Sequence, residues 1–228
     1  MASTNNFRAK SFVGSTRTGI TYKAVLSDGS ELAIKRLNAC KLNEKQFRSE
    51  MNRLGQLSVM PRLWRHPNLA PALGLCVVEE EKFLVYKQMS NGTLYSLLYG
   101  NEIVLDWADR FRIALGAARG LAWLHHGCQP PILHQNISSS VILLDEDFDG
   151  RIIDFGLVRL MISSESNGSS FVKDDFGDFG YVALEYSSTV VASLKRDVYG
   201  FGGVLLKLAT GQKPHKVCDT EPMVKRSN

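Results

Sequence analysis

The chain has 228 residues, of which 44% are hydrophobic and 22% charged, and its formal net charge at pH 7 is +4. This length allows a sizeable core in one large or two small domains. The mild positive charge is spread along the chain, which argues against a nucleic-acid-binding surface. No apolar run approaches the roughly 20 residues of a membrane span, and the first ten residues lack the apolar stretch of a signal peptide. As given, the chain is expected to stay in the cytoplasm.

The first third of the chain is predicted to be rich in β-structure. Runs of β-branched and apolar residues favour strands at residues 20–25, 31–37, 73–78 and 82–86. The Asp28-Gly29 pair between the first two runs indicates a tight hairpin turn. Residues 43–57 repeat apolar side chains at three- and four-residue spacing, and Asn43 is a suitable N-cap. These patterns predict a small sheet with one helix.

The rest of the chain is predicted to be mainly helical. Residues 107–126 form an amphipathic pattern whose apolar face holds Phe111, Ala114, Leu115, Ala118, Leu121 and Ala122. The segment from Ser193 onward is apolar nearly all round, which predicts a helix buried inside a larger lobe. The expected fold class is therefore α+β, with a β-rich lobe followed by a helical lobe.

A polar loop between these helices has the layout of a catalytic loop. The sequence ILHQNISSSVILLD, residues 132–145, runs from polar side chains into four apolar residues and then a carboxylate. Before that last aspartate the loop contains no acid and no cation, and His134 is its one side chain of suitable pKa for a base. The loop predicts a buried strand that supports a site with little chemistry of its own.

Four segments occur in an order that carries more information than any one of them. They are the Gly-rich stretch Gly14–Gly19, then Lys35 in a predicted strand with Glu50 in the following helix, then the HQN sequence at residues 134–136, and last Asp154-Phe155-Gly156. Each segment alone is common in proteins. Together, in this order and spacing, they match the signature set of protein kinases.

The chain therefore resembles a protein kinase domain, and more narrowly the plant leucine-rich-repeat receptor-like kinases. The narrower resemblance is carried by TNNF (residues 4–7), LVYKQMSNGTL (84–94) and the long stretch at 121–149. HQNIS (134–138) and EYSSTVVASLKRDVYGFG (185–202) are most similar to the inactive branch, the BAK-interacting receptor-like pseudokinases.

The resemblance implies a two-lobed kinase fold that is incomplete at its C-terminal end. It places an N-lobe of five strands and one helix in residues 1–89, a partial C-lobe in residues 90–214 and a divergent polar tail in residues 215–228. Residues 58–64 are an insertion relative to the family, either a lengthened loop after the helix or an unspliced stretch of gene.

The resemblance also shows which catalytic groups are replaced. Active kinases carry His-Arg-Asp-x-Lys-x-x-Asn in this loop, and here the Asp, Lys and Asn positions are Asn136, Ser138 and Val141. An amide cannot act as a base at neutral pH, and loss of a general base typically lowers the rate by about 10²–10⁴-fold. Asp178 is a conceivable substitute base, but no nearby cation replaces Ser138. We expect no intact catalytic residue and hence no kinase activity.

Two hypotheses remain open for the nucleotide site. The resemblance implies that ATP and one magnesium ion would be bound by Gly14, Gly19, Ala33, Lys35, Glu50, Tyr86, Met89, Leu143 and Asp154. In this assignment Lys35 and Glu50 form the pair that orients the α/β-phosphates, and Asp154 is the metal ligand. Against this, Thr16 and Thr21 stand where the family has a middle glycine and a valine over the adenine. Forcing Thr16 to positive φ would cost about 1–3 kcal/mol. The alternative is an inherited ion-pair network with weak or absent ATP binding, which the sequence slightly favours.

Three functions are compatible with these residues. The resemblance implies a regulatory pseudokinase that binds an active receptor-like or co-receptor kinase in plant signalling, at the inner face of the plasma membrane. The second is a weak ATP-dependent Ser/Thr kinase, and the third is a truncated product without function. Neither nucleic acid nor a membrane span is expected in any of the three.

Overall fold

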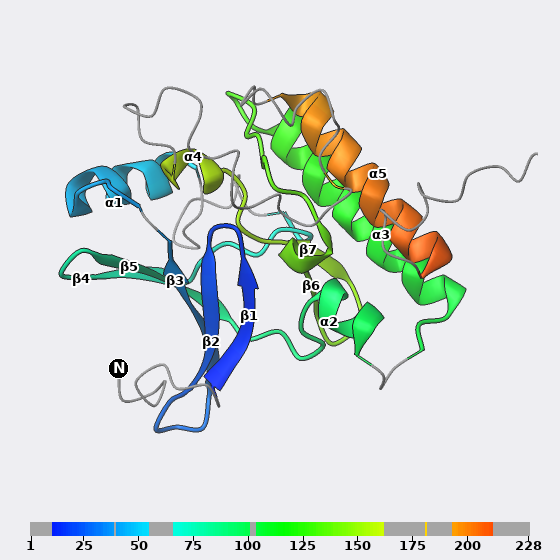
Figure 1. Ribbon diagram of the computed structural model, residues 1–228, viewed down its shortest axis with the longest axis horizontal. Helices are drawn as coiled ribbons and strands as arrows, with labels where there is room; N and C mark the ends of the chain where they lie inside the picture. The colour runs from blue at the N-terminus through cyan, green and yellow to red at the C-terminus, as the bar shows by residue number, and fades with distance from the viewer. Residues whose placement is uncertain are drawn as a thin grey trace, which may run out of the picture.

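The computed structural model describes residues 11–38, 40–54, 66–100, 104–161, 181 and 193–211. Within these ranges the strands β1 to β5 and helix α1 form one lobe, and the longest helices, α3 and α5, lie side by side in the other (Figure 1). The insertion at 58–64, Asp178 and the tail at 215–228 lie outside the described residues. No helix in the described ranges is long and apolar enough to cross a membrane.

The first lobe is built on an antiparallel sheet with the strand order β1-β2-β3-β5-β4. Its strands are β1 (Phe12–Thr16), β2 (Gly19–Val25), β3 (Glu31–Leu37), β4 (Gly74–Val78) and β5 (Glu81–Lys87). The four predicted strands are confirmed to within one residue at each end. The predicted hairpin turn is also present, because Gly29 has a φ of +83° and Asp28 Oδ1 accepts a hydrogen bond from Ser30 N at 2.9 Å.

Helix α1 (Glu44–Arg53) follows β3 and begins with a capping box. Asn43 Oδ1 accepts from Gln46 N at 2.9 Å, and Gln46 Oε1 accepts from Asn43 N at 3.1 Å. The predicted N-cap is confirmed, and the helix ends at Arg53 rather than at residue 57. Phe47 and Met51 are fully buried in the core, so the helix is held by its apolar face.

The second lobe contains two long helices and several short elements that position its loops. They are α2 (Leu94–Tyr99), α3 (Trp107–Ala122), a π-helical turn (Trp123–Gly127), β6 (Ile142–Leu144), β7 (Gly150–Ile152), α4 (Val158–Met161) and α5 (Leu194–Thr210). β6 and β7 form a separate antiparallel pair. The apolar run after the His134 loop is therefore a strand, as predicted.

Helix α3 buries a different face from the predicted one. Of the six predicted face residues only Leu121 is buried, and Phe111 is 59% exposed. The buried positions are Ile113, Gly116, Ala117, Gly120 and Leu121. A Cβ at Gly116 would lie 2.9 Å from Gly150 O, and one at Gly120 would lie 2.6 Å from Asn68 O. The glycine side of the helix therefore makes the close contact, which hydrophobic periodicity could not reveal.

Helix α5 is buried on one side only, so the prediction that it is buried all round is wrong. Its buried residues are Asp197, Gly200, Val204, Lys207 and Leu208, whereas Val198 and Leu205 are 57% and 41% exposed. The helix packs against α3, and in the described ranges no element covers its opposite face.

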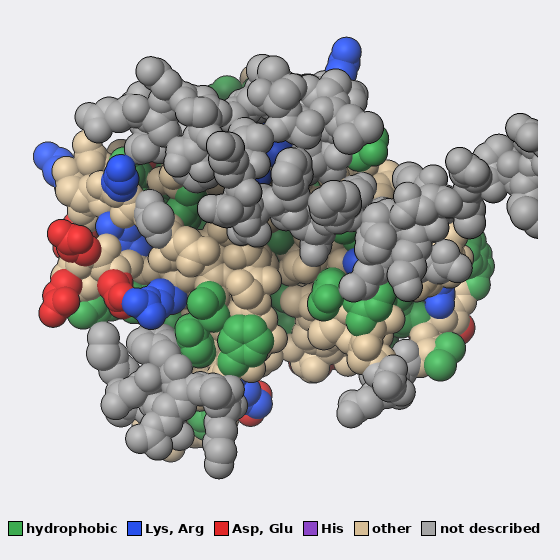
Figure 2. All heavy atoms as spheres, viewed as in Figure 1, with side chains coloured by type: hydrophobic (Ala, Val, Ile, Leu, Met, Phe, Trp, Pro, Cys, Tyr) green, Lys and Arg blue, Asp and Glu red, His purple; other side chains and the backbone are tan. Residues whose placement is uncertain are grey.

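Charged side chains of both signs are interspersed on the face of the molecule shown in Figure 2, where Lys and Arg are blue and Asp and Glu are red. The coloured residues form no large patch of a single sign there.

Candidate functional site

A cleft of about 650 Å³ lies between the sheet and the α2–β6 region. Most of the residues that the resemblance assigns to a nucleotide site line it, namely Gly14, Ala33, Lys35, Tyr86, Met89 and Leu143. Thr16 and Thr21 line it as well. The cleft thus gathers residues from β1, β2, β3, β5 and β6, although they are up to 129 positions apart in the chain.

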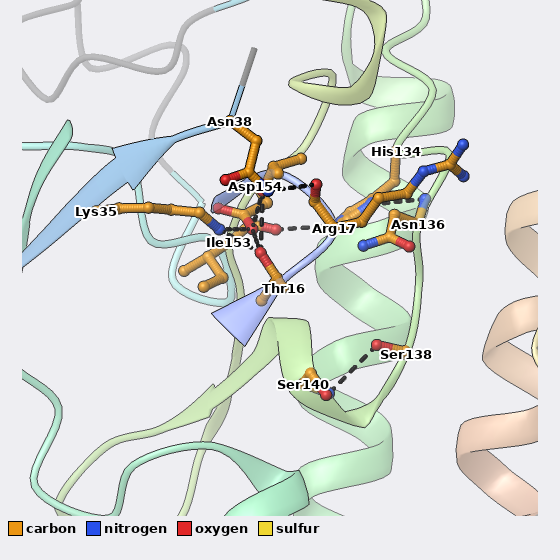
Figure 3. Close-up of polar contacts among 11 residues, drawn as sticks. Thr16, Arg17, Lys35, Asn38, His134, Asn136, Ser138, Ser140, Ile153 and Asp154 are labelled. Carbon is orange, nitrogen blue, oxygen red and sulfur yellow. Dashed lines mark hydrogen bonds and ion pairs between the residues drawn. The ribbon is translucent and has the colours of Figure 1, made fainter. Parts of the chain in front are cut away.

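At one end of this cleft Lys35 forms a buried ion pair with Asp154. Both side chains have no exposed surface, and the Lys35 Nζ atom donates to Asp154 Oδ2. The same carboxylate oxygen accepts from Thr18 Oγ1 at 2.8 Å and from Thr16 Oγ1 at 3.1 Å. Figure 3 shows Lys35 and Thr16 converging on Asp154. One oxygen of Asp154 therefore receives three donors, while its Oδ1 is buried without a partner in the described structure.

Burial and the ion pair act in opposite directions on these two groups. Burial lowers the pKa of Lys35, and the negative charge of Asp154 opposes this. Burial pushes the pKa of Asp154 upward, but Lys35 and the Thr18 hydroxyl outweigh it, so that this pKa lies below its usual value. The carboxylate is therefore held in its charged form by the donors around it.

The Gly-rich segment places Thr16 in this position. β1 and β2 form a hairpin whose turn is Arg17-Thr18, and Lys35 Nζ also donates to Thr16 Oγ1. Thr16 lies in strand β1 and is not among the described non-glycine residues with positive φ. Thr16 is therefore not forced to a positive φ, and the strain that such a conformation would cost does not arise. The Thr16 hydroxyl lies against Lys35 and Asp154, the two side chains that the resemblance assigns to phosphate and metal binding.

Glu50 is not part of this cluster. Its Oε2 atom accepts from Arg53 Nε at 2.9 Å and from Arg53 Nη2 at 2.7 Å, both on the same helix. The hydrogen bond from Arg53 is the main cause of its lowered pKa. Lys35 therefore forms its ion pair with Asp154, and Glu50 forms its ion pair with Arg53. These two pairs replace the Lys35–Glu50 pair that the resemblance implies.

The His134 loop is held by buried groups that sequence reasoning did not assign. The Asp197 carboxylate, on α5, accepts from His134 N and from Gln135 N, both at 2.7 Å. His125 Nε2 lies 3.0 Å from the same carboxylate, and His134 Nε2 lies 2.8 Å from Ile153 O. An acid among the apolar residues of α5 was the signal available in the sequence. The backbone of the loop is thus held by the Asp197 carboxylate, although the side chains at the catalytic positions are replaced.

A buried lysine strengthens this support. Lys207 is 2% exposed and its Nζ atom lies 2.8 Å from Ser139 Oγ, in the loop. The ammonium also lies over the rings of Tyr95, Tyr99 and Tyr181, at 5.1, 4.5 and 5.3 Å from their centres. These contacts join α2, α5 and the loop.

The three replaced catalytic positions have local structural roles. Asn136 N donates to His134 Nδ1 at 3.3 Å, and Ser138 Oγ caps a 3₁₀ turn (Ser139–Val141) by accepting from Ser140 N. Val141 has no exposed surface and packs with Ala70 and Ile153. Asn136 cannot serve as the base, Ser138 carries no positive charge, and Val141 has no oxygen for a metal.

These contacts test whether magnesium and nucleotide phosphates fit the site. Mg²⁺ requires several oxygen ligands in near-octahedral geometry. Val141 offers no oxygen, and Asp154 offers only its unpaired Oδ1, because its Oδ2 is engaged by three donors. The described residues contain no group of three or more His, Cys, Asp or Glu side chains that could hold a metal. Lys35, the cation that the resemblance assigns to phosphate binding, forms its ion pair with Asp154. The phosphate and metal end of the cleft therefore lacks a second protein ligand for the metal at Val141, and its lysine is paired with Asp154.

Comparison with known proteins agrees with this geometry. Residues 7–228 match the family model described as protein tyrosine and serine/threonine kinase. The chain is 68% identical over 213 residues to the inactive LRR receptor-like serine/threonine-protein kinase BIR2 of Arabidopsis thaliana, covering 93% of this chain and 34% of that protein. A probable inactive receptor kinase of the same plant is 63% identical, over 95% of this chain and 35% of its own length. The chain spans about a third of the length of these relatives.

A solved structure also matches the chain, and it too is a kinase-fold domain described as inactive in name, a pseudokinase. The pseudokinase domain of BIR2, described as an immune regulator of the RLK/Pelle family, matches with a TM-score of 0.79 and 66% identity. The match covers 93% of this chain and 62% of that one. A further Arabidopsis relative, 60% identical over 98% of this chain and 36% of its own length, is named a probable LRR receptor-like serine/threonine-protein kinase without the word inactive.

Proposed function

The chain belongs to the protein tyrosine and serine/threonine kinase family, among its inactive leucine-rich-repeat receptor-like members, and we propose that it is a pseudokinase domain that regulates an active receptor kinase by binding to it. Its two-lobed kinase fold is retained, and the predicted fold class is confirmed. Phosphoryl transfer is lost, and the fold serves as a recognition surface.

The observation that carries this proposal is the state of Lys35. In phosphoryl transfer this lysine, the metal and a base must act together on the phosphates. Here Lys35 is buried against Asp154 under two threonine hydroxyls, and Asn136 stands where the base is needed. The support of the loop by Asp197 and Lys207 remains. A site that keeps its support and loses its reacting groups is suited to holding a shape.

The regulatory part of the proposal rests on the relatives. BIR2 is described as an immune regulator of the RLK/Pelle family. By this similarity we propose that the partner is an active receptor-like or co-receptor kinase and that the two meet at the inner face of the plasma membrane. The chain would act there by occupying a surface of the partner, without transferring phosphate to it.

Two measurements test the proposal. Purified protein is incubated with radiolabelled ATP, magnesium or manganese and a generic substrate, and no incorporation above background is expected. Incorporation that disappears in an Asp154→Ala variant would show catalysis and overturn the pseudokinase assignment. Binding is measured against immobilised kinase domains of plant leucine-rich-repeat receptors. If the protein binds none of the kinase domains in such a panel, the regulatory role is overturned.

A weak Ser/Thr kinase is the second candidate, and the name of the 60% identical relative favours it. That activity would need a substitute for the base at Asn136 and a rearrangement that frees Lys35 from Asp154. The same assay separates the two candidates, because only a kinase loses incorporation when Asp154 is replaced.

A further inference from the structure

Two arginine side chains come together beside the His134 loop without an acid to pair with, and we infer that they bind a phosphate dianion carried by the side chain of a partner protein. Arg17 lies in the turn of the β1–β2 hairpin, and Arg196 lies in the first turn of α5. Neither residue lines the cleft described above, so the proposed site is separate from it. The choice of partner rests on the proposed function.

The β1–β2 hairpin fixes the position of Arg17. The residues on either side of it, Thr16 and Thr18, both donate to Asp154 Oδ2, at 3.1 and 2.8 Å. Figure 3 shows the Arg17 side chain pointing from this anchored turn toward the part of the His134 loop that carries Asn136. Arg17 is partly exposed, so a group from outside the molecule can reach it.

Arg196 is positioned by the start of α5. Its backbone N donates to Ser193 Oγ, the N-cap of the helix, at 3.2 Å. The next residue, Asp197, accepts from two backbone N–H groups of the His134 loop, both at 2.7 Å. The first turn of α5 therefore lies against this loop, which brings Arg196 to the region toward which Arg17 points.

The positive charges of the two guanidinium groups repel each other. Burial lowers the pKa of Arg196, the charge of Arg17 lowers it further, and the charge of Asp197 opposes both effects. Arg196 also lies at the helix end where the helix dipole disfavours a cation. An anion bound between the two arginines would turn this repulsion into two attractions.

The acids of this region are already engaged by other groups. Asp154 accepts from Lys35 and from two threonine hydroxyls, and Asp197 lies within hydrogen-bonding distance of His125 as well as of the loop backbone. Among the described residues no carboxylate forms an ion pair with Arg17 or Arg196. The two arginines therefore remain available to a ligand.

A phosphate dianion suits this pair better than a carboxylate does. Each guanidinium group is a planar fork of donors that can bind two phosphate oxygens at once. A phosphorylated serine or threonine carries a charge of about −1.5 to −2 at pH 7 and three acceptor oxygens, whereas a carboxylate carries a single charge. The partner in the proposed function is an active kinase, which transfers phosphate to hydroxyl side chains. A phosphorylated side chain of that partner is therefore the expected ligand.

Fluorescence anisotropy with three labelled peptides tests the inference. The peptides share one neutral sequence and carry serine, phosphoserine or glutamate at a single position. The phosphoserine peptide is expected to bind at least tenfold more tightly than the other two. Equal binding of the glutamate peptide would overturn the inference, as would no detectable binding of the phosphoserine peptide at millimolar concentration.

Inorganic phosphate distinguishes a free ligand from a protein-borne one. It is expected to compete with the phosphoserine peptide at the same arginines, with an affinity at least tenfold weaker. An affinity equal to that of the peptide would assign the site to free phosphate and overturn the protein-borne source.

Variants locate the phosphate at the two arginines. Arg17→Gln and Arg196→Gln should each weaken binding of the phosphoserine peptide by about 10- to 100-fold, because each removes charge-assisted hydrogen bonds. Arg48→Gln is the matched control, since it removes the same charge from an exposed pair with Glu44, and it should leave the affinity unchanged. Affinity that is unaffected by both site variants would show binding elsewhere and overturn the assignment.

The unfolding temperature without ligand separates a binding role from a structural one. Neither Arg17→Gln nor Arg196→Gln should lower it, because each variant removes a repulsion between like charges. A lower unfolding temperature in both variants would show that the arginines stabilise the fold, and it would overturn the inference.

Phosphatase treatment of the panel of kinase domains separates this inference from the proposed function. Panel members that bind the protein only before treatment support both. Binding that treatment leaves unchanged overturns the inference, and the proposed function stands. Binding of the phosphoserine peptide without binding of any panel member supports the phosphate site and overturns the regulatory role.

Discussion

Replacing Lys35 by methionine is expected to destabilise the protein by about 3–5 kcal/mol, because it leaves a buried carboxylate without its counter-ion. Both Lys35 and Asp154 are fully buried. Methionine keeps most of the apolar stem of the lysine, so the loss of charge dominates over the loss of packing. The hydroxyls of Thr16 and Thr18 still donate to Asp154, which places the expected value toward the lower end of this range.

Urea unfolding at pH 7 measures the effect, and thermal unfolding should show a decrease of roughly 6–20 °C. Two charge-removing variants serve as matched controls. Lys23→Met breaks an exposed pair with Glu31, at 2.6 Å with both side chains more than 40% exposed, and it should cost less than about 1 kcal/mol. Glu50→Gln should cost about as little, because the ion pair that Glu50 makes among the described residues is a partly exposed one with Arg53 on the same helix.

The pH dependence provides an independent check of the same ion pair. The pKa of Asp154 lies below the ordinary 3.8, so its contribution to stability is present above that pH and is lost as pH falls through the folded-state value. In Lys35→Met the unpaired carboxylate has a raised pKa instead, and protonation relieves it. The gap between the two proteins should therefore narrow on acidification. A Lys35→Met loss no larger than that of Lys23→Met, or a Glu50→Gln loss as large as that of Lys35→Met, would refute the pairing.

Three further outcomes are expected. Asn136→Asp alone should not restore phosphotransfer in the radiolabel assay, because base, cation and metal ligand act as a unit; a strong gain would contradict this. Burial lowers the pKa of His134 below the ordinary 6.5, so stability in urea should fall as pH drops below about 6.5, where the unfolded chain takes up the proton first, and less steeply in His134→Gln. Gly19→Ala should cost about 1–3 kcal/mol in thermal unfolding, because its Cβ would lie 2.2 Å from Arg36 O, whereas Gly14→Ala, with open space at its Cβ, should stay within about 0.5 kcal/mol.

Local patterns in the sequence predicted the elements well where the signal itself is local. The Asp28-Gly29 turn fixes the β2–β3 hairpin through its own backbone and side-chain hydrogen bonds. Asn43 begins α1 because its side chain caps that helix within the same turn. Such features need no distant partner, so alternation and capping were sufficient to place them.

The buried face of a helix was predicted less well. In α3 hydrophobicity pointed to Phe111 and Leu115, which are exposed, whereas Gly116 and Gly120 lie against the backbone of Gly150 and Asn68. Close backbone contact selects residues without side chains, and a hydrophobic pattern does not register them. The one-sided burial of α5 has the same origin, since it depends on which elements pack beside the helix.

Residue types alone were enough to predict the family, the kinase fold and the loss of base, cation and metal ligand, because the side chains at Asn136, Ser138 and Val141 decide what chemistry is possible. The match to the kinase motifs also assigned Lys35 and Asp154 to one predicted site. It did not determine which charges pair, because Lys35 has two candidate acids at family spacing. The pairing follows from how the segments pack: the β1–β2 hairpin directs two threonine hydroxyls onto Asp154, while Glu50 pairs with Arg53 on its own helix. Opposite charges interact over a few ångströms, and that distance is set by packing between segments more than a hundred residues apart.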